Sequence, residues 1–189
     1  MASFRAQSAE LQAVLSAFAV QAAAVDTIAG LVAEALLAGR TLFTCGNGGS
    51  AADAMHLAEE LVGRYRSNRR PLAGLCLNAD GGALTCIAND FGYTQVFARP
   101  LAALGQPGDI LVVFSTSGNS PNILEALHVA RSRGMLSVAL LGNAGGPALP
   151  LADHALVVPS QASARIQEVH GLILHALCEE IEERTSATR

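Results

Sequence analysis

The chain has 189 residues, a length that fits one domain or one domain with an N-terminal extension. Hydrophobic residues make up 51% and aromatic residues 4%, with no Trp, so we expect a sizeable core built from Ala, Leu, Val and Ile. The net charge of −4, with no basic run, argues against nucleic acid as a ligand.

The cysteines and the N-terminus indicate a cytoplasmic protein. The four cysteines are scattered without C-x-x-C spacing, and we interpret them as reduced, mostly buried thiols: Cys45, Cys76, Cys86 and Cys178. The first ten residues lack an apolar segment after a basic one, so they do not form a signal peptide. We also expect no apolar run long enough to span a membrane, and no membrane partner.

The N-terminal segment is rich in Ala and carries apolar side chains at helical spacing. We predict two helices over residues 7–37, with a break near residues 20–26 and a stop at Gly39. Residues 1–38 then form a helical extension that packs on the domain and on neighbouring subunits. Packing on the sheet of the same chain alone is the alternative.

Residues 39–189 alternate between short apolar runs and helical patterns, which predicts an α/β fold. We expect a doubly wound, five-stranded parallel sheet covered by helices on both faces. The strands are expected near residues 41–45, 73–77, 110–114, 136–141 and 155–158, and the helices near 51–65, 82–89, 93–104, 121–133 and 163–183. In such a sheet the ligand lies at the carboxyl ends of the strands.

The first expected strand runs into a glycine-rich turn, Cys45-Gly-Asn-Gly-Gly-Ser50, and then into a helix. The first turn of a helix has unpaired N–H groups and a positive dipole end, and glycines let an anion approach the backbone closely. The pattern therefore predicts a phosphate-binding turn. Ser50 also fits a helix N-cap with Asp53 as its capping-box partner, and capping alone is the alternative.

The same turn also fits a dinucleotide fingerprint, with Gly46, Gly48 and Ala51 at the required spacing. That fingerprint needs an acidic residue about 20 positions on, at the end of the next strand. The nearest candidate, Asp80, comes too late. We therefore favour a phosphate site over a nucleotide site.

The second turn, Ser115-Thr-Ser-Gly-Asn-Ser120, brings four hydroxyl groups into six residues. Ser120 fits the N-cap of a helix that opens with Pro121 at its first position. A plain turn needs one or two polar residues, so four hydroxyls favour phosphate binding. Two such turns at strand ends predict a site for a phosphorylated small molecule.

Two helices supply reactive side chains. His56 and Glu60 stand four residues apart and share a helix face, which Arg64 continues. A solvated ion pair is the alternative for His56 and Glu60. On the last helix, Gln167 and His175 are eight residues apart and return to roughly one face. For His175, the alternative is a histidine satisfied within the core.

Four segments resemble the phosphoheptose isomerases of the sugar-isomerase (SIS) domain superfamily: residues 45–65, 88–93, 115–120 and 165–170, together with His175. Their sequences include Cys-Gly-Asn-Gly-Gly-Ser-Ala-Ala-Asp-Ala-Met-His, Ala-Asn-Asp-Phe-Gly-Tyr, Ser-Thr-Ser-Gly-Asn-Ser and Arg-Ile-Gln-Glu-Val-His. That family interconverts sedoheptulose 7-phosphate and D-glycero-D-manno-heptose 7-phosphate, the first step towards ADP-heptose or GDP-heptose for lipopolysaccharide and related glycoconjugates.

The resemblance implies roles for individual residues. Glu60 and His175 match the acid/base pair, and His56, Glu60, Gln167 and His175 match a set that holds one Zn²⁺ per subunit in some members. No organic cofactor is implied. The substrate contacts match Asn47, Gly48, Gly49, Ser50, Asn89, Asp90, Ser115, Thr116, Ser117, Ser120 and Gln167.

The family is tetrameric with active sites between subunits, which implies a homotetramer here. The chain departs from the family pattern at Ala164, where some members have Asp just before Arg-Ile-Gln. Any polar role of that Asp is absent here. The acid/base pair itself is intact.

The implied chemistry suits the residue types. Aldose–ketose isomerisation passes through an enediol and needs a base, an acid and stabilisation of the developing oxyanion. We assign Glu60 as the base and His175 as the acid, and a zinc ion would polarise the carbonyl. The alternative is a non-catalytic SIS-domain protein that binds the bacterial replication initiator and shares residues 163–168. That relative lacks the matches to His175 and to the acidic pattern at Glu59-Glu60, so their retention favours the enzyme.

Overall fold

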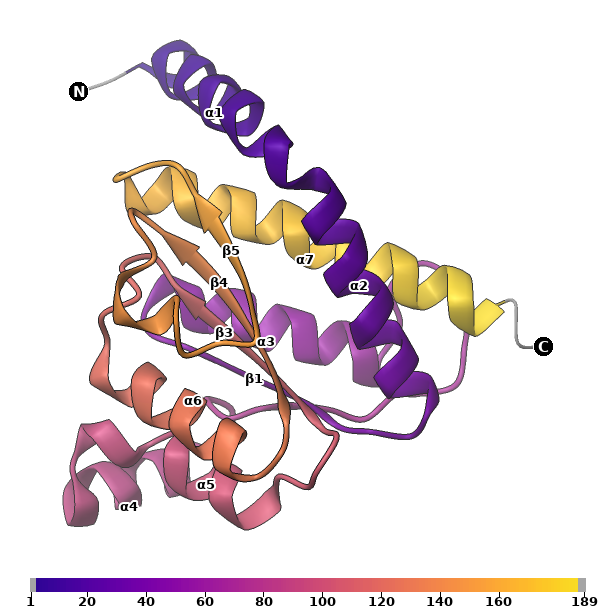
Figure 1. Ribbon diagram of the computed structural model, residues 1–189, viewed down its shortest axis with the longest axis vertical. Coiled ribbons are helices and arrows are strands. Elements are labelled where there is room, and N and C mark those ends of the chain that lie inside the picture. Colours follow the sequence, from indigo (N-terminus) through magenta and orange to yellow (C-terminus); the bar gives the residue numbers. More distant parts are fainter. Residues whose placement is uncertain (1–2, 187–189) are drawn as a thin grey trace.

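Five strands form one parallel sheet in the order β2-β1-β3-β4-β5 (Figure 1). The computed structural model describes residues 3–186, so residues 1–2 and 187–189 of the predicted domains lie outside the described residues. The strands are β1 Leu42–Gly46, β2 Gly74–Cys76, β3 Ile110–Ser115, β4 Leu136–Gly142 and β5 His154–Val158. The predicted five-stranded parallel sheet is confirmed, with every strand placed within two residues of its expected bounds.

Helices cover both faces of the sheet, as predicted for a doubly wound fold. One face packs against α1 Phe4–Phe18, α2 Ala22–Leu37, α3 Gly49–Val62 and α7 Ser163–Ser186. The other face packs against α4 Gly81–Phe91, α5 Ala98–Leu104 and α6 Pro121–Ser132. Alternate residues of β3 divide between the two cores, Val112 with the first and Val113 with the second, because successive side chains of a strand point to opposite faces.

The N-terminal segment belongs to the first of these cores. A 3-10 turn at Ala19–Gln21 separates α1 from α2, close to the predicted break. In Figure 1, α1 extends beyond the sheet, whereas α2 lies alongside α7. Val32 and Ala33 of α2 are fully buried there. We predicted that residues 1–38 form a separate unit that also contacts neighbouring subunits, and this stays a prediction.

The stretch Phe4–Leu37 is the one part of the described chain that is long and apolar enough to cross a membrane, judged by length and composition alone. This differs from the expectation that no apolar run reaches that length. The stretch joins α1, the 3-10 turn and α2, and buried helices of globular proteins pass the same test. The contacts of α2 with α7 show that part of the stretch is such a core helix.

Two helix boundaries differ from the predictions for clear physical reasons. The helix expected over residues 93–104 is a 3-10 turn, Tyr93–Gln95, followed by α5. Proline fits only the first turn of a helix, and Pro100 is the third residue of α5. The helix expected to reach residue 65 ends at Val62. Two carbonyl groups of its last turn, those of Glu60 and Leu61, accept hydrogen bonds from the Arg69 guanidinium instead.

Candidate active site

The turn after β1 places a helix start at the carboxyl edge of the sheet. Gly48 has φ +58°, a conformation that favours glycine, and α3 begins at the next residue. The N-cap is therefore Gly48, and the prediction that Ser50 caps this helix is wrong. Ser50 is the second helical residue and is buried. Its hydroxyl has no hydrogen-bond partner within residues 3–186, so capping does not account for this serine.

The four hydroxyl groups of the turn after β3 are of two kinds: two bind the backbone of the turn, and two do not. Ser115 Oγ accepts a hydrogen bond from Gly118 N at 3.1 Å, and Ser117 Oγ accepts one from Asn119 N at 3.2 Å. These two hydroxyls fold the turn. Ser120 is the N-cap residue of α6 and Pro121 follows at N1, as predicted, but the Ser120 side chain caps no N–H group. The hydroxyls of Thr116 and Ser120 have no partner among the described residues.

Both turns lie at the point where the strand order changes direction. β1 and β3 are neighbours, paired through Gly46 and Phe114 near their carboxyl ends, while β2 lies on the outer side of β1 and β4 on the outer side of β3. In open α/β sheets this crevice is where ligands bind. Two helix N-termini and unused hydroxyls meet there, an arrangement that can hold an anion such as phosphate.

Reactive side chains from α3 and α7 converge about two helix turns along α3 from this crevice. Glu60 Oε1 lies 3.2 Å from His56 Nε2. The His175 ring stands edge to face with the His56 ring, with centroids 5.2 Å apart. His56, Glu60 and His175 are all half-buried. The two helices run side by side in the same direction, because Gly49 meets Gln167 near their starts and Tyr65 meets Glu179 further on.

The core histidine of α7 is His170, not His175. His170 is fully buried, and its Nε2 lies 3.1 Å from the Leu141 carbonyl oxygen. Burial lowers the pKa of His170 to about 4, against the smaller opposing effect of that hydrogen bond, so the ring is neutral at physiological pH. His175 instead faces His56 and Tyr65, the latter ring stacked at 5.9 Å.

The segment after α3 fastens this helix to α7. The Tyr65 hydroxyl donates to Glu179 Oε1 at 3.3 Å, beside His175. Arg69, which is 8% exposed, donates to the carbonyl oxygens of Glu60 and Leu61 at 2.6 and 3.0 Å. A cation is favourable there because the C-terminal end of a helix carries partial negative charge. The segment after α3 therefore fixes the position of Glu60 along the helix axis relative to His175.

Glu182 of α7 anchors the same segment. Its carboxylate accepts hydrogen bonds from Arg66 N and Ser67 N and lies 3.9 Å from Arg69 Nε. Burial of this carboxyl group opposes ionisation, but the hydrogen bonds from Ser67 and Arg66 and the charge of Arg69 outweigh it. They hold the pKa of Glu182 below its ordinary range.

The donor set at the convergence fits a divalent metal ion. Ligand atoms of His56, Glu59 and Glu60 lie within 4.8 Å of one another. Two histidines and one glutamate form one of the ligand sets of catalytic zinc. The His175 ring is a second imidazole next to this group, with its centroid 5.2 Å from that of His56. Gln167 lies elsewhere. A Cβ on Gly49 would be 2.6 Å from Gln167 Nε2, so its amide packs on the glycine-rich turn. Eight residues of helix, about 12 Å, separate it from His175.

The segment that contains Asn89 and Asp90 is connected to the turn after β1 by a hydrogen bond from a tyrosine. Both residues are exposed on the last turn of α4, where Asn89 Nδ2 donates to Asp90 Oδ1 at 2.7 Å. Tyr93 follows two residues after α4, and its hydroxyl donates to Asn47 Oδ1 at 3.1 Å. Asp80, the misplaced acid of the dinucleotide fingerprint, caps α4 by accepting from Ala83 N.

Residues 7–142 match the family model of the SIS domain. A phosphoheptose isomerase from Paramagnetospirillum magneticum is 53% identical over 149 residues, which are 79% of this chain and 78% of that protein. Phosphoheptose isomerase 1 from Campylobacter jejuni is 48% identical over 92% of this chain and 94% of its own. The chain belongs to the phosphoheptose isomerase family of SIS-domain proteins. The alternative of a non-catalytic initiator-binding protein gains no support from these relatives.

The fold of this phosphoheptose isomerase family member matches a solved relative. The structure of a phosphoheptose isomerase from Neisseria gonorrhoeae superposes with a TM-score of 0.89 at 39% identity, covering 95% of this chain and 96% of that one. The N-terminal helices are part of this match, since nearly the whole chain is covered. The family assignment from sequence motifs and the predicted SIS fold are therefore confirmed.

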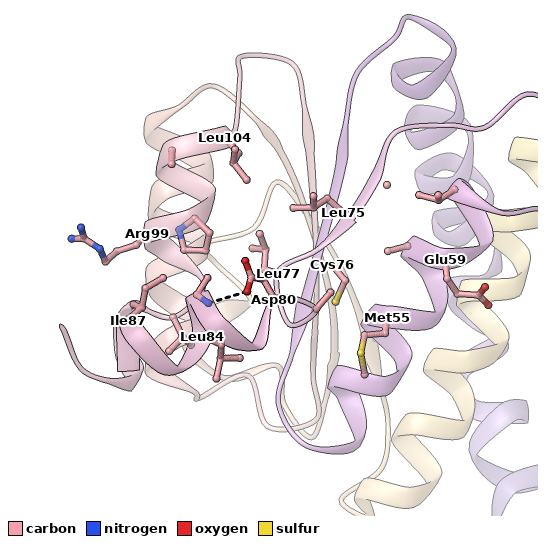
Figure 2. A pocket seen from close by; sticks show the side chains of 18 residues that line it. Met55, Glu59, Leu75, Cys76, Leu77, Asp80, Leu84, Ile87, Arg99 and Leu104 are labelled. Atoms are coloured by element: carbon pink, nitrogen blue, oxygen red, sulfur yellow. Dashed lines mark hydrogen bonds between the residues drawn. The ribbon is translucent and has the colours of Figure 1, made fainter. Parts of the chain in front are cut away.

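One large cavity of this family member lies on the other flank of α3 (Figure 2). It has a volume of about 870 Å³, and apolar residues of α3, β2, α4 and α5 form most of its lining. Met55 and Glu59 line it from α3, whereas His56 meets α7 on the opposite side. Of its polar residues, Asp80 caps α4 and Arg99 stacks on the Phe91 ring at 3.6 Å. Glu59 belongs both to this lining and to the group of ligand atoms with His56 and Glu60, so the cavity lies next to that group along α3.

Several residues around the site carried no clear signal in the sequence. Tyr65 and Tyr93 stand inside the motifs of the family but gave no reason to assign them contacts with His175 or Asn47. Nothing in the sequence set Arg69 and Glu182 apart from other charged residues. A lone Arg shortly after a helix end can bind its last carbonyls, and that pattern was the one available clue.

Proposed function

We propose that this protein is an aldose–ketose isomerase that converts D-sedoheptulose 7-phosphate to D-glycero-D-manno-heptose 7-phosphate through an enediol. The convergence of His56, Glu60 and His175, about two helix turns from the two anion-binding turns, carries the proposal. The names of the relatives support it. The product would feed ADP-heptose or GDP-heptose synthesis for lipopolysaccharide and related glycoconjugates.

The phosphate would bind at the two turns. Thr116 and Ser120 would donate their hydroxyl groups, with Ser50 from the first helix and backbone N–H groups of both helix starts. Gly48 and Gly49 leave room for close approach of the ligand, and Ser115 and Ser117 hold the second turn in shape. Asn47, Asn89, Asp90 and Gln167 would contact the sugar chain.

Glu60 would act as the base and His175 as the acid. Glu60 takes a proton from C1 of the ketose while His175 gives one to the carbonyl oxygen on C2, which forms the enediol. Glu60 then returns a proton to C2, and the hydroxyl group on C1 gives its proton to His175, which completes the aldose. The half-buried position of both groups strengthens these interactions relative to water.

A zinc ion held by His56, Glu60 and His175 would supply Lewis-acid polarisation of the carbonyl. An imidazole nitrogen that faces a metal ion carries no proton there. The acid role of His175 and its ligand role at the same nitrogen therefore exclude each other. Measurements with and without a chelator separate the two modes.

The proposal also includes a homotetramer in the cytoplasm. Phe4 and Val20 on the N-terminal segment are 86% and 87% exposed, which suits burial against other subunits. All four cysteines are free, and three of them are buried, as suits a reducing compartment.

The deciding experiment is a direct assay of aldose formation from D-sedoheptulose 7-phosphate, run with and without a chelator. We expect turnover by the wild-type protein and a kcat lower by about 10²–10⁴-fold for Glu60→Gln. An inactive wild type that binds a replication-initiator protein would instead support the non-catalytic alternative.

A further inference from the structure

Three asparagine side chains link the carboxyl ends of neighbouring strands. Asn78 follows β2, and its amide pairs with both backbone groups of Gly46 at the end of β1. Asn78 Nδ2 donates to the Gly46 carbonyl at 2.9 Å, and Asn78 Oδ1 accepts from Gly46 N at 3.2 Å. The side chain thus extends the hydrogen-bond ladder between β2 and β1 by one step.

The residue after β1, Asn47, continues the link to the start of α6, which follows the turn after β3. Asn47 Nδ2 donates to Asn122 Oδ1, and Asn122 Nδ2 donates to Asn47 Oδ1, both at 2.9 Å. Asn122 is the second residue of α6 and is 2% exposed. This reciprocal amide pair joins the two turns assigned above to the phosphate, and it does so through one buried side chain.

A backbone group fixes the orientation of both amides. The N–H of Ile123 can only donate, so the Asn122 atom 3.0 Å from it is Oδ1. The Asn47 atom facing that oxygen must then be Nδ2. Asn47 Oδ1 is left to accept from Asn122 Nδ2 and from the Tyr93 hydroxyl. The one polar group of the Asn47 side chain still unused is its second Nδ2 hydrogen.

We propose that Asn122 is a positioning residue, which holds the Asn47 amide so that it presents an N–H donor, and no acceptor, to an oxygen atom of the sugar. The proposal rests on the isomerase function proposed above. A buried amide with both ends paired allows one orientation, because turning either amide would set oxygen against oxygen and nitrogen against nitrogen. Specificity for a hydroxyl or carbonyl oxygen at this point of the substrate follows.

The variant Asn122→Asp tests this because it changes one atom. The carboxylate keeps the acceptor for Ile123 N but sets an oxygen against Asn47 Oδ1, which disturbs the Asn47 amide. We expect kcat/KM for sedoheptulose 7-phosphate to fall at least about ten-fold at pH 7.5. The inhibition constant of inorganic phosphate measures how far the new negative charge at the start of α6 weakens anion binding by itself, and kcat/KM should fall by a clearly larger factor than that constant rises.

A pH profile separates positioning from a general structural defect. When the carboxyl group that Asn122→Asp introduces is protonated, it carries an O–H that donates to Asn47 Oδ1 and restores the reciprocal pair. The ratio of variant to wild-type kcat/KM should therefore rise as the pH falls towards the pKa of that carboxyl group. In an Asn47→Ala background, Asn122→Asp should cause no loss beyond its effect on phosphate binding, since Asn122 acts on the sugar through Asn47.

Two further variants keep the test decisive. Tyr93→Phe removes a hydrogen bond to the same Asn47 oxygen from an exposed residue, so it leaves the fold intact, and it should lower kcat/KM about two- to five-fold. Ser137→Ala is the matched control. It removes a buried side-chain hydrogen bond to Asp153 at the opposite edge of the sheet, so it should lower Tm with kcat/KM unchanged.

Each outcome decides the proposal. An active wild type with a folded Asn122→Asp that keeps wild-type kcat/KM, or loses it equally at every pH, overturns the positioning role alone. If Asn122→Asp does not fold, unchanged kinetics in Tyr93→Phe overturn it. A wild type that neither converts nor binds sedoheptulose 7-phosphate overturns the proposed function and this inference together.

Discussion

The imidazole rings of His56 and His175 stand edge to face, with their centroids 5.2 Å apart, although they come from different helices. Each histidine alone has an ordinary explanation, as half of an ion pair or as part of a helix packed on a core. Their contact, with Glu60 Oε1 3.2 Å from His56 Nε2, makes one reactive group from two helices.

Ser120→Ala should weaken binding of the sugar phosphate by about ten-fold or more, because a hydrogen bond to a charged group contributes about 1.5–3 kcal/mol. Ser50→Ala should act similarly. Tm should change little for Ser120→Ala, since its hydroxyl caps no N–H group of α6. Calorimetric titration measures the affinity. Ser132→Ala, at the other end of α6, is the control, and unchanged affinity with a lower Tm in Ser120→Ala would assign the serine to the fold.

Protein purified without chelator should contain about one zinc ion per subunit by elemental analysis. His56→Gln should lose most of this metal, because it removes one imidazole from a group that His175 and Glu60 complete. His128→Gln, an exposed histidine on α6, should keep it. A protein without divalent metal that stays fully active in EDTA would remove zinc from the mechanism.

The sequence was most informative where structure is local. Parallel strands buried on both faces are short apolar runs, so all five were recognised, and the helix start at Pro121 followed from the place of proline. Ser50 misled because Gly48 adopts a positive φ and starts the helix two residues earlier. The preference of serine for the N-cap position does not reveal where the backbone takes a positive φ.

Contacts between elements that are distant in the sequence could not be predicted from local sequence patterns. The pairing of Asn47 with Asn122 depends on the register of β1 against β3, and no periodicity in either segment reports it. Helical spacing on α7 likewise gave no means to decide which histidine is buried. The structure places His170 in the core and leaves His175 half-buried beside His56.

Glu182→Gln should destabilise the protein at pH 7 by about 1–3 kcal/mol, because the carboxylate accepts charge-assisted hydrogen bonds from the turn after α3. The folded-state pKa of Glu182 is depressed, so its stabilisation is fully present above the unfolded-state pKa of about 4.3. It is lost as the pH falls through the lower folded-state value.

The stability difference between wild type and Glu182→Gln should therefore shrink in urea unfolding as the pH is lowered below about 4. Glu183→Gln, the exposed neighbour on α7, is the control and should change stability little at any pH. A difference that stays constant down to about pH 3 would show that Glu182 contributes packing and not charge.

Light scattering at micromolar concentration should give a mass four times the 19.4 kDa of one chain. The reason is the apolar surface of the N-terminal segment, where Val20 is 87% exposed. Val20→Glu should shift the protein to smaller species while its circular dichroism stays helical. Gln12→Glu, an exposed polar position on α1, should leave the mass unchanged. A monomeric wild type would contradict the tetramer and the placing of active sites between subunits.

The pairing of Glu60 with His175 separates an enzyme from a binding protein. Glu60→Gln keeps the shape of the side chain but removes the base, so kcat should fall by about 10²–10⁴-fold with little change in substrate affinity. His175→Gln should do likewise. The double variant should lose far less than the product of the two single losses, because a proton relay without one member gains little from the other. His170→Gln disrupts the buried histidine of the same helix and should lower Tm more than kcat, since His170 contacts the Leu141 carbonyl and not the reactive group. Turnover near that of the wild type in either single variant would rule out this acid/base assignment.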